Sequence, residues 1–356
     1  MSFLKELCEE YNAQINSSGI EISEENNSPL EVVLKDGQLD TSKITEYKGD
    51  ALKKFEFRPQ KWEQFIGQSE AKRLAKKFKK KIKHGNMKSH FFIDGIKGHG
   101  KTTYVELFAK DLNAHLIERV GKQINEDNLI DIINEINTCE EQNVILFVDE
   151  MDSMDSKIVK VLNPIIESFK IAGKKIKPFI FVGATINKHI LIKNNPDTLD
   201  RIPPTHHIKF NRYNTNEIAT ILEQYHQQLF SNITIDKEIY FAIGKNCKFN
   251  PRTAIAMLED YVVEKDIQKV LDDCKIVKDG LNNVDIRILK ILNARNKPIG
   301  AKALAQKAGL NEKEYTTEFE PYLFEYDYID RVPSRIITEK GKILLSKIKN
   351  KENNNV

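Results

Sequence analysis

The chain has 356 residues, of which 40% are apolar and 30% charged. It is therefore too long for one ordinary domain and too balanced in composition for a disordered chain. Its longest apolar runs, 144–148 and 178–182, are far shorter than the ~20 residues that cross a bilayer, and its first residues lack the apolar core of a secretory signal. We expect a cytoplasmic protein of two to four folded units with no membrane partner.

The net charge of +3 hides an uneven distribution. Residues 1–57 carry six Lys against twelve Asp and Glu, which leaves +9 for the rest of the chain. Such an excess permits an anionic partner such as nucleic acid without requiring one. The four cysteines, Cys8, Cys139, Cys247 and Cys274, form no C-x-x-C pair and have no histidine at metal-ligand spacing. Neither a disulfide framework nor a zinc module is expected.

The first two predicted parts of the chain differ in their patterns. Residues 1–56 are rich in Glu, Asn and Ser, with one weak hairpin signal at 30–34 before Asp36-Gly37, and we interpret them as an accessory, partly disordered extension. Residues 57–212 alternate apolar runs of strand length with helical periods, which is typical of an α/β domain with a parallel sheet covered on both faces. Strands are expected at 91–93, 115–117, 144–148, 179–182 and 207–210, and helices at 101–112, 126–139 and 156–169.

Two further domains and a tail complete the chain. Residues 213–278 predict a helical lid domain that begins with Asn214 or Thr215 as the cap and Glu217 in the first turn. Residues 279–350 contain three helical stretches, 284–292, 301–307 and 312–324, then a strand pair at 328–332 and 335–338. This is the pattern of a winged helix-turn-helix domain. Residues 351–356 are predicted to be a frayed polar tail.

A phosphate-binding loop carries the strongest chemical signal. Residues 95–102, Gly-Ile-Lys-Gly-His-Gly-Lys-Thr, fit G-x-x-x-x-G-K-[ST] between a predicted strand and a predicted helix. Backbone N–H groups of such a loop surround phosphate oxygens, and the helix adds its positive end. We expect Lys101 to reach the β- and γ-phosphates of ATP and the Thr102 hydroxyl to bind Mg²⁺. The remaining predicted contacts are Gly95, Gly98, His99, Gly100 and Thr103.

Two later strand ends add candidate catalytic groups. The strand at 144–148 ends in Asp149, placed to hold Mg²⁺, and Glu150, placed to deprotonate the attacking water. A carboxylate there favours hydrolysis over binding alone. The next strand ends at 183–187, where a polar side chain is able to hydrogen-bond the γ-phosphate or the water, although an ordinary strand cap is the alternative. Arg201 and Arg252 follow, with surface ion pairs as their alternative role.

These motifs occur in the order typical of AAA+ ATPases. The segment 57–68, the phosphate loop, 148–150, 183–185, 200–201 and 251–254 resemble that class, and more narrowly the RuvB family of bacterial Holliday-junction branch-migration motors. The segments 280–289, 319–323 and 330–338 are similar to the winged-helix domain of this family. The resemblance covers about 57–349 and leaves residues 1–56 outside.

The resemblance implies roles for individual residues. Thr185, with Asn187 as the alternative, corresponds to sensor 1, and Arg252 in the lid to sensor 2. Arg201 corresponds to an arginine finger that reaches the nucleotide of a neighbouring subunit, so the implied state is a ring, a hexamer, with double-stranded DNA or a four-way junction as its load. The contacts implied around the adenine are Arg58, Pro59, Phe65 and Ile66.

The chain also departs from the family pattern. Ile96-Lys97 and His99 replace the Pro-Pro and Leu of the family loop, and Asp152 replaces a His after the acidic pair. The segment 170–178 is shorter than the hairpin through which the family contacts RuvA. A RuvA-like junction-binding partner is implied by the resemblance, but this short segment argues against it.

The predicted DNA contacts lie in the wing. Arg331 and Arg335 flank a tight turn that is able to enter a minor groove, where Arg reads width and charge. The segment 72–83 has eight basic residues in twelve and is interpreted as a solvated helix face rather than a DNA contact. We predict an ATP-driven DNA motor. The alternatives are a replication-initiator or loader-type ATPase that switches binding without translocation, and a scaffold ring, which Glu150 disfavours.

Overall fold

The computed structural model describes residues 57–354, except 86–88, 187, 189–190, 193–200, 296 and 332–333, together with two short strands before them. The chain divides into two compact units, Met1–Phe55 and Glu56–Val356. In the first unit, β1 (Leu34–Lys35) pairs antiparallel with β2 (Gln38–Leu39). The predicted hairpin signal is therefore confirmed, with strands that begin later than 30–34, whereas the predicted disorder of residues 1–56 lies outside the described residues.

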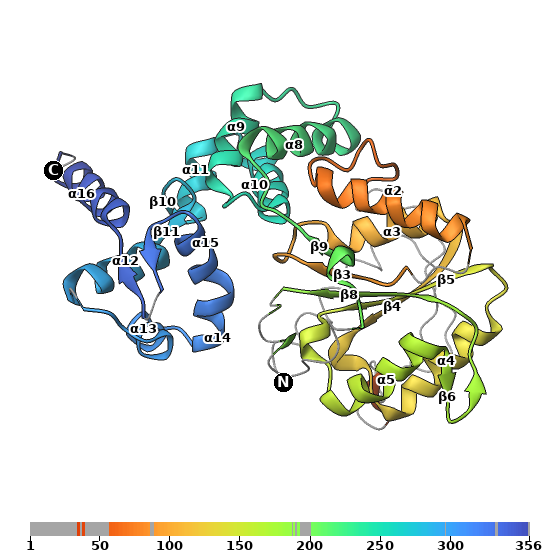
Figure 1. The fold of residues 1–356 in the computed structure, drawn as a ribbon. Helices are drawn as coiled ribbons and strands as arrows, with labels where there is room; N and C mark the ends of the chain where they lie inside the picture. The colour runs from red at the N-terminus through yellow and green to blue at the C-terminus, as the bar shows by residue number, and fades with distance from the viewer. Residues whose placement is uncertain are drawn as a thin grey trace, which may run out of the picture. The chain divides into compact units, whose positions relative to one another are not determined.

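A five-stranded parallel sheet forms the first domain of the second unit (Figure 1). Its spatial order is β4 (Ala114–Val120), β5 (Asn143–Asp149), β8 (Ile180–Thr185), β3 (Phe91–Asp94) and β9 (His207–Lys209), and every neighbouring pair is parallel. The carboxyl ends of all five strands therefore meet at one edge, where ligands bind in open α/β sheets. All five predicted strands are confirmed.

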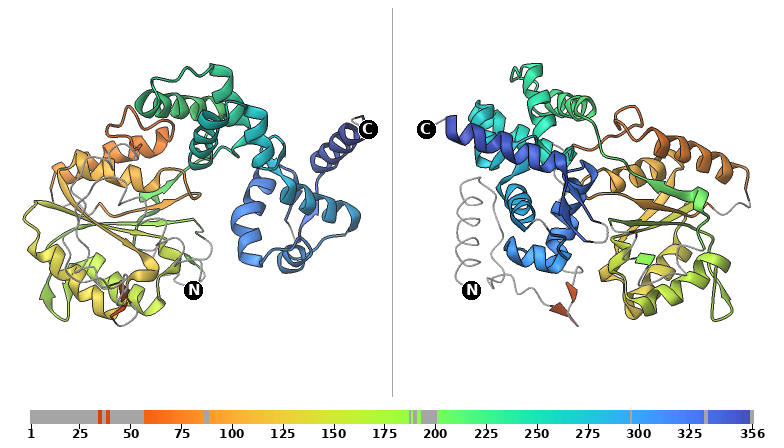
Figure 2. Two further views of the ribbon diagram at one scale, coloured as in Figure 1. Left: turned by 180° about the vertical axis from the view of Figure 1, so that it is seen from behind. Right: turned by 60° about the vertical axis from the view of Figure 1, so that its left-hand side comes forward.

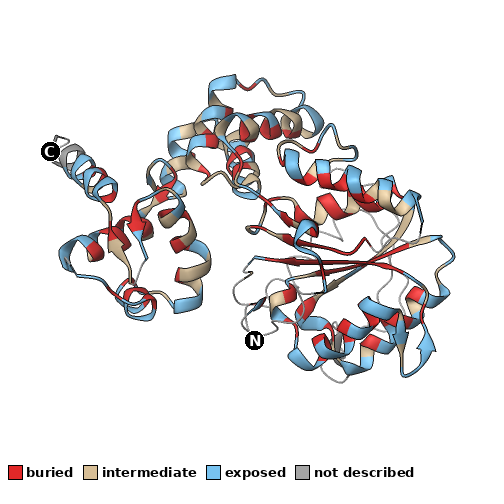
Figure 3. Cartoon of the chain, viewed as in Figure 1, coloured by how far each residue is buried: buried red, intermediate tan, exposed pale blue. Residues whose placement is uncertain are grey.

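Helices cover both faces of this sheet, as Figures 1 and 2 show. Phe91 and Ile93 of β3 pack toward α2 (Ser69–Lys83) and α3 (Lys101–Asp111), whereas Phe92 between them joins the core under α4 (Glu126–Thr138) and α5 (Ser156–Ser168). This alternation follows from the twofold side-chain period of a strand. Figure 3 shows buried residues on both sides of the sheet. The three predicted helices end within one residue of their predicted positions.

The basic helix α2 buries one face and exposes its charges. Leu74 and Phe78 are buried, while Lys79 pairs with Asp111 and Arg73 with Glu70. These contacts agree with the interpretation of α2 as a packed helix with a solvated cationic side.

The lid consists of four helices, α8 (Thr215–Leu229), α9 (Lys237–Asn246), α10 (Pro251–Glu264) and α11 (Ile267–Asp273). Asn214 caps α8: its side chain accepts from the backbone of Glu217, whose carboxylate accepts from the backbone of Asn214. The capping box fixes where the chain leaves the sheet and turns into the lid. It confirms Asn214 rather than Thr215 as the cap.

The C-terminal domain is a winged helix built from α12 (Asn283–Arg295), α13 (Ala301–Lys307), α14 (Glu312–Glu314), α15 (Glu320–Glu325) and the pair β12 (Ile329–Asp330) and β13 (Ile336–Ile337). A single helix was predicted over 312–324. Instead, the wider turn η6 (Tyr315–Phe319), a π-helix, separates α14 from α15. Pro321 explains the change, because it has no N–H to donate to the preceding turn.

The last helix was not predicted. Helix α16 (Glu339–Asn354) follows the wing, and its Leu344 and Ile348 join the winged-helix core. The expected fraying of residues 351–356 stays a prediction. Before the winged helix, β10 (Ile276–Lys278) pairs with β11 (Leu281–Asn282), a hairpin that the sequence did not predict. No described helix is both long and apolar enough to span a bilayer.

Candidate nucleotide-binding site

The phosphate loop joins β3 to α3 through backbone angles that favour glycine. Gly98 and Gly100 have φ of 81° and 88°, a region that residues with a Cβ rarely adopt. A Cβ at Gly98 would also lie 2.5 Å from Oδ1 of Asn250, the N-cap of α10. The loop therefore depends on glycine both for its turn and for its close approach to the lid.

Lys101 lies in the centre of this loop and is 7% exposed. Its Nζ donates to the carbonyl oxygens of Gly95 at 2.7 Å and Ile96 at 3.2 Å. Burial lowers the pKa of this ammonium, while the carboxylate of Asp149 acts in the opposite direction. A phosphate anion in the loop would replace these carbonyls with stronger, charged acceptors.

One cavity of about 480 Å³ contains most of the predicted site, a volume within the usual range for small-molecule sites. It lies between the phosphate loop, the acidic pair, the segment before α2 and the lid helix α10. The predicted residues that line it are Arg58, Pro59, Phe65, Ile66, Gly98, Gly100, Lys101, Thr102, Thr103, Asp149, Glu150 and Arg252. The structure thus brings together residues spread over almost 200 positions.

The remaining predicted residues lie elsewhere. Gly95 starts the loop, and its N–H donates to the carbonyl of Thr185 on β8. Thr185 is buried and donates its hydroxyl to Asp152, so its link to the cavity runs through the loop backbone. Asn187, the alternative sensor, lies outside the described residues. Arg201 is exposed, pairs with Glu167 at the end of α5, and is not among the described residues that line this cavity.

The acidic pair stands on a strained turn. Glu150 has φ of 48°, and its N–H donates to Oδ1 of Asp149 at 2.8 Å. The short turn η3 (Gly121–Gln123) lies directly against it, because a Cβ on Gly121 would be 2.6 Å from the carbonyl oxygen of Glu150. Gly121 was not singled out in the sequence, since nothing near it marks a close backbone approach.

We expect Gly121→Ala to lower ATP turnover by about 100-fold, because a displacement of about 1 Å is enough for such a loss. The added methyl group must push the turn that carries Glu150, whereas the loop that holds the phosphates does not touch Gly121. Steady-state turnover and binding of a fluorescent ATP analogue measure the two effects separately. Gly300→Ala is the matched control, because a Cβ there meets nothing within 4 Å. Unchanged turnover in Gly121→Ala would contradict this prediction.

His99 is the unusual residue of the loop, with a fully buried side chain. Its Nδ1 is 3.3 Å from the carbonyl oxygen of Lys97, and since a carbonyl only accepts, Nδ1 carries the proton. No partner for Nε2 is found among the described residues. Burial lowers the pKa of His99 to about 4. The side chain of His99 is therefore neutral and packs in the interior, where it contacts the ring of Tyr213. The predicted ATP contact of this residue stays a prediction, through its backbone N–H in the loop.

This burial predicts an acid sensitivity. Above the unfolded pKa of 6.5, His99 is neutral in both states and costs nothing. As the pH falls toward 4 only the unfolded chain gains the proton, so at pH 5 the domain loses about 2 kcal/mol. We expect His99→Leu to remove this loss. Urea midpoints at pH 7.5 and 5, followed by the fluorescence of Trp62, measure it against an exposed-site control, His84→Leu. Equal pH dependence of His99→Leu and wild type would disprove it.

The lid contacts the loop through residues that the sequence analysis did not single out for the site. The side-chain amide of Asn250 donates to the carbonyl oxygen of Lys97 at 3.0 Å. The hydroxyl of Tyr213 donates to the backbone carbonyl oxygen of His99 at 3.2 Å. Tyr213 also lines the cavity, with Ile221, Gln224 and Ile255 of the lid. Asn250 was not predicted as part of the site, although its position as a cap before Pro251 was the available signal.

The two predicted DNA contacts differ in the structure. Arg331 is exposed, with its guanidinium 3.9 Å from the centre of the Phe324 ring. Arg335 instead forms a two-bond ion pair with the buried Glu320. Arg335 therefore holds the wing against α15, and Arg331 is the one of the two whose surroundings leave it open to a ligand.

The parallel sheet with this strand order, the G-x-x-x-x-G-K-T loop and the lid that borders its cavity define a AAA+ P-loop ATPase, which binds nucleotide and carries a C-terminal winged helix. Residues 57–198 match the family model "Holliday junction DNA helicase RuvB P-loop domain", and residues 278–346 match "RuvB C-terminal winged helix domain". Residues 1–56 lie before both matches.

Whole-chain relatives agree with these matches. The chain is 30% identical to the Holliday junction branch migration complex subunit RuvB of Campylobacter lari over 328 residues, covering 84% of this chain and 92% of the relative. It is 29% identical to that of Ureaplasma parvum, covering 81% and 95%. The structure of the Thermotoga maritima RuvB Holliday junction branch migration motor superposes with a TM-score of 0.69 at 26% identity, covering 81% and 98%. The chain belongs to the RuvB family of branch-migration motors, which confirms the predicted resemblance.

Proposed function

We propose that this chain hydrolyses ATP with Mg²⁺ to move the branch point of four-way DNA junctions, and that it works as a hexameric ring on double-stranded DNA. The observation that carries the proposal is the single cavity lined by Lys101, Glu150 and Arg252. These residues come from the phosphate loop, the acidic turn and the lid. A ligand that fills the cavity must therefore contact both the ATPase domain and the lid. Cleavage of the ligand then changes the contacts that hold the lid against the ATPase domain.

The residues divide the chemistry of hydrolysis among them. Lys101 exchanges its carbonyl partners for phosphate oxygens, and the backbone N–H groups of the loop hold the other phosphate oxygens of ATP. Thr102 and Asp149 supply oxygens on the same cavity wall and fit a Mg²⁺ ion, which when bound neutralises charge on the phosphates. The carboxylate of Glu150 accepts a proton from the attacking water. Arg252 adds a positive charge from the lid, and this charge is near the phosphates only when the lid lies against the phosphate loop.

The structure supports a route from this site to the wing. Asn250 links the loop to the lid, and Lys248, two residues before it, forms an ion pair with the fully buried Asp285 of α12 at 2.6 Å. Arg212, at the entrance to the lid, pairs with Glu325 at the end of α15. Motion of the lid would therefore carry the winged helix with it, and Arg331 would meet a DNA phosphate at its exposed end.

A RuvA-like partner has little surface to bind at the short hairpin. The strands β6 (Lys170–Ile171) and β7 (Lys174–Lys175) contain two residues each, and Ala172 and Gly173 both have positive φ, as a tight two-residue turn requires. Ile171 is partly buried against the domain core. We propose that the motor acts on junctions without contact of the family type through this hairpin.

A junction assay tests the proposal. A synthetic four-way junction with homologous arms is incubated with the chain and MgATP, and we expect ATP-dependent conversion to two duplexes. A junction with heterologous arms, which has no duplex products to reach, and the Glu150→Gln variant are the controls. DNA-stimulated hydrolysis without arm exchange, at any ring concentration, would reject the motor and favour an initiator-type or loader-type switch.

A further inference from the structure

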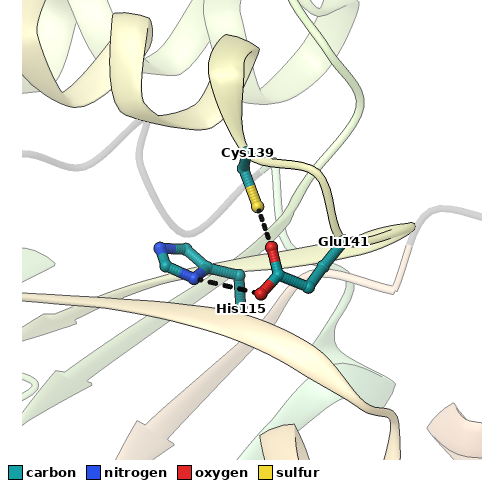
Figure 4. Close-up of side chains that lie close together, drawn as sticks. All are labelled: His115, Cys139 and Glu141. Carbon is teal, nitrogen blue, oxygen red and sulfur yellow. Dashed lines mark hydrogen bonds and ion pairs between the residues drawn. The ribbon is translucent and has the colours of Figure 1, made fainter.

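Three side chains with metal-binding atoms lie close together beside the edge strand β4 (Figure 4). They are His115 on β4, Cys139 at the end of α4 and Glu141 in the turn before β5. Their ligand atoms all lie within 4.8 Å of one another. No spacing motif in the sequence predicts this group, because 24 positions separate the histidine from the cysteine and the pairing of β4 with β5 brings them together.

The distances suit a tetrahedral metal ion. Sγ of Cys139 is 2.9 Å from Oε2 of Glu141, and Nδ1 of His115 is 3.7 Å from Oε1 of the same carboxylate. Zinc–ligand bonds of about 2.0–2.3 Å at tetrahedral angles place neighbouring ligand atoms roughly 3.3–3.6 Å apart. Small side-chain rotations therefore convert the observed contacts into ligand spacing without moving the backbone.

The backbone around the cluster is already held in place. Nζ of Lys177 donates to the carbonyl oxygens of Cys139 at 2.6 Å and Glu141 at 2.8 Å, and the N–H of Lys177 donates to Oδ1 of Asn137. These bonds fix the turn that carries both ligands. The ammonium opposes binding of a cation nearby, and it faces the carbonyls rather than the thiol.

A second carboxylate supports the histidine of this cluster. Glu135 lies one helical turn before Cys139, and its Oε1 is 3.6 Å from Nε2 of His115, the ring nitrogen opposite the one that faces Glu141. Glu135 therefore orients the imidazole rather than binding the metal itself, and water is the fourth ligand at this partly exposed site. The donor set of one imidazole, one thiol and one carboxylate suits Zn²⁺, because Mg²⁺ and Ca²⁺ prefer oxygen alone.

We propose that His115, Cys139 and Glu141 bind one Zn²⁺ ion that ties the edge strand β4 to the end of α4. The hydrogen bond from the Cys139 thiol to Glu141 shows which proton the metal displaces: Zn²⁺ and the thiol give a zinc thiolate and one H⁺ released to solvent. The thiol donates this hydrogen bond and so carries its proton before binding, and the affinity therefore increases with pH.

The site is independent of the nucleotide. His115 is near the start of β4 and Glu141 just precedes β5, whereas Asp149 ends β5. Seven strand residues span about 20 Å, so the zinc ligands and the Mg²⁺ ligands lie at opposite edges of the sheet. Binding at the two sites is therefore separable by experiment.

The test uses Co²⁺ as a spectroscopic probe of the untagged, reduced, chelator-treated full chain. We expect a thiolate-to-cobalt charge-transfer band that saturates at one equivalent, disappears when Zn²⁺ is added, and is unaffected by MgATP. Cys139→Ser should abolish the band, while Cys274→Ser, which changes a partly exposed cysteine outside the cluster, should keep it. Loss of even a group that only supports a metal ligand costs about 10–100-fold in affinity, so His115→Gln should weaken binding at least about tenfold.

Two results would overturn the zinc site. One is the absence of a thiolate band in the wild-type chain at any Co²⁺ concentration that leaves the protein folded. The other is a band that survives in Cys139→Ser, which would place the metal on another thiol. Release of about one proton per Zn²⁺ at neutral pH, measured in weak buffer, is expected from the chemistry, and its absence would also contradict thiolate ligation.

Discussion

Glu150→Gln is expected to lower ATP turnover by about 10²–10⁴-fold, the usual contribution of a positioned general base. Glutamine keeps the shape of the side chain on the strained turn but cannot accept the proton of the attacking water. Nucleotide binding should stay close to that of the wild type, because the phosphates are held by the loop and Lys101. Single-turnover hydrolysis and equilibrium binding, measured on the same preparation, separate the two steps.

Lys101→Ala provides the contrasting result. Its ammonium now donates to two loop carbonyls. When ATP binds, the ammonium is expected to donate to phosphate oxygens instead, so its removal should lower both nucleotide binding and turnover. Lys160→Ala, which removes an exposed lysine of α5 that does not line the cavity, is the matched control and should leave both unchanged. If both single variants, Glu150→Gln and Lys101→Ala, turned over ATP at the wild-type rate, the assignment of this cavity as the hydrolytic site would be refuted.

Much of the ATPase domain was predictable because its elements carry strong local signals. A buried parallel strand is a continuous apolar run, as in 144–148, and each such run is bounded by polar or glycine residues. Capping signals located the helices almost as well: Asn214 with Glu217 reports the start of α8 whatever surrounds it. The correctly predicted helices and strands are therefore those whose bounds are determined by residues close to them in the sequence.

The features that the sequence did not predict occur where distant contacts decide the structure. Helix α16 was not predicted, and it buries Leu344 and Ile348 in the winged-helix core. The side chain of His99 is buried against Tyr213, 114 residues away, and nothing in the loop motif indicates this contact. The need for Gly121 arises from the backbone of Glu150. None of these contacts leaves a periodic signal in the sequence.

The candidate site shows the same division. The loop and the acidic pair were found from the sequence because their chemistry requires fixed residue types at fixed spacing. The lid side of the cavity, with Tyr213 and Gln224, has no such constraint, since any side chain of suitable size and polarity serves. The cluster of His115, Cys139 and Glu141 is the extreme case, because the pairing of two parallel strands creates its spacing.

Arg201→Ala is expected to lower turnover by about 10³–10⁵-fold, as loss of an arginine finger does in other phosphoryl-transfer enzymes. The structure makes this a prediction about assembly. Arg201 is exposed, pairs with Glu167 on the surface and is not among the described residues that line the cavity, so we expect it to contact a γ-phosphate bound by another subunit. Glu167→Gln, which frees Arg201 without removing it, should retain turnover and serves as the control.

Mixing two inactive variants separates action between subunits from action within one. Arg201→Ala keeps an intact cavity, and Glu150→Gln keeps an intact finger, so each can complete the other only across an interface. In randomly mixed rings with head-to-tail interfaces, roughly a quarter of the sites combine both intact parts and should hydrolyse ATP. Energy transfer between differently labelled subunits establishes that the rings have exchanged. If exchanged rings remain as inactive as the separate variants, Arg201 acts within its own subunit or through folding, and hydrolysis does not depend on a neighbour in the way its exposed position implies.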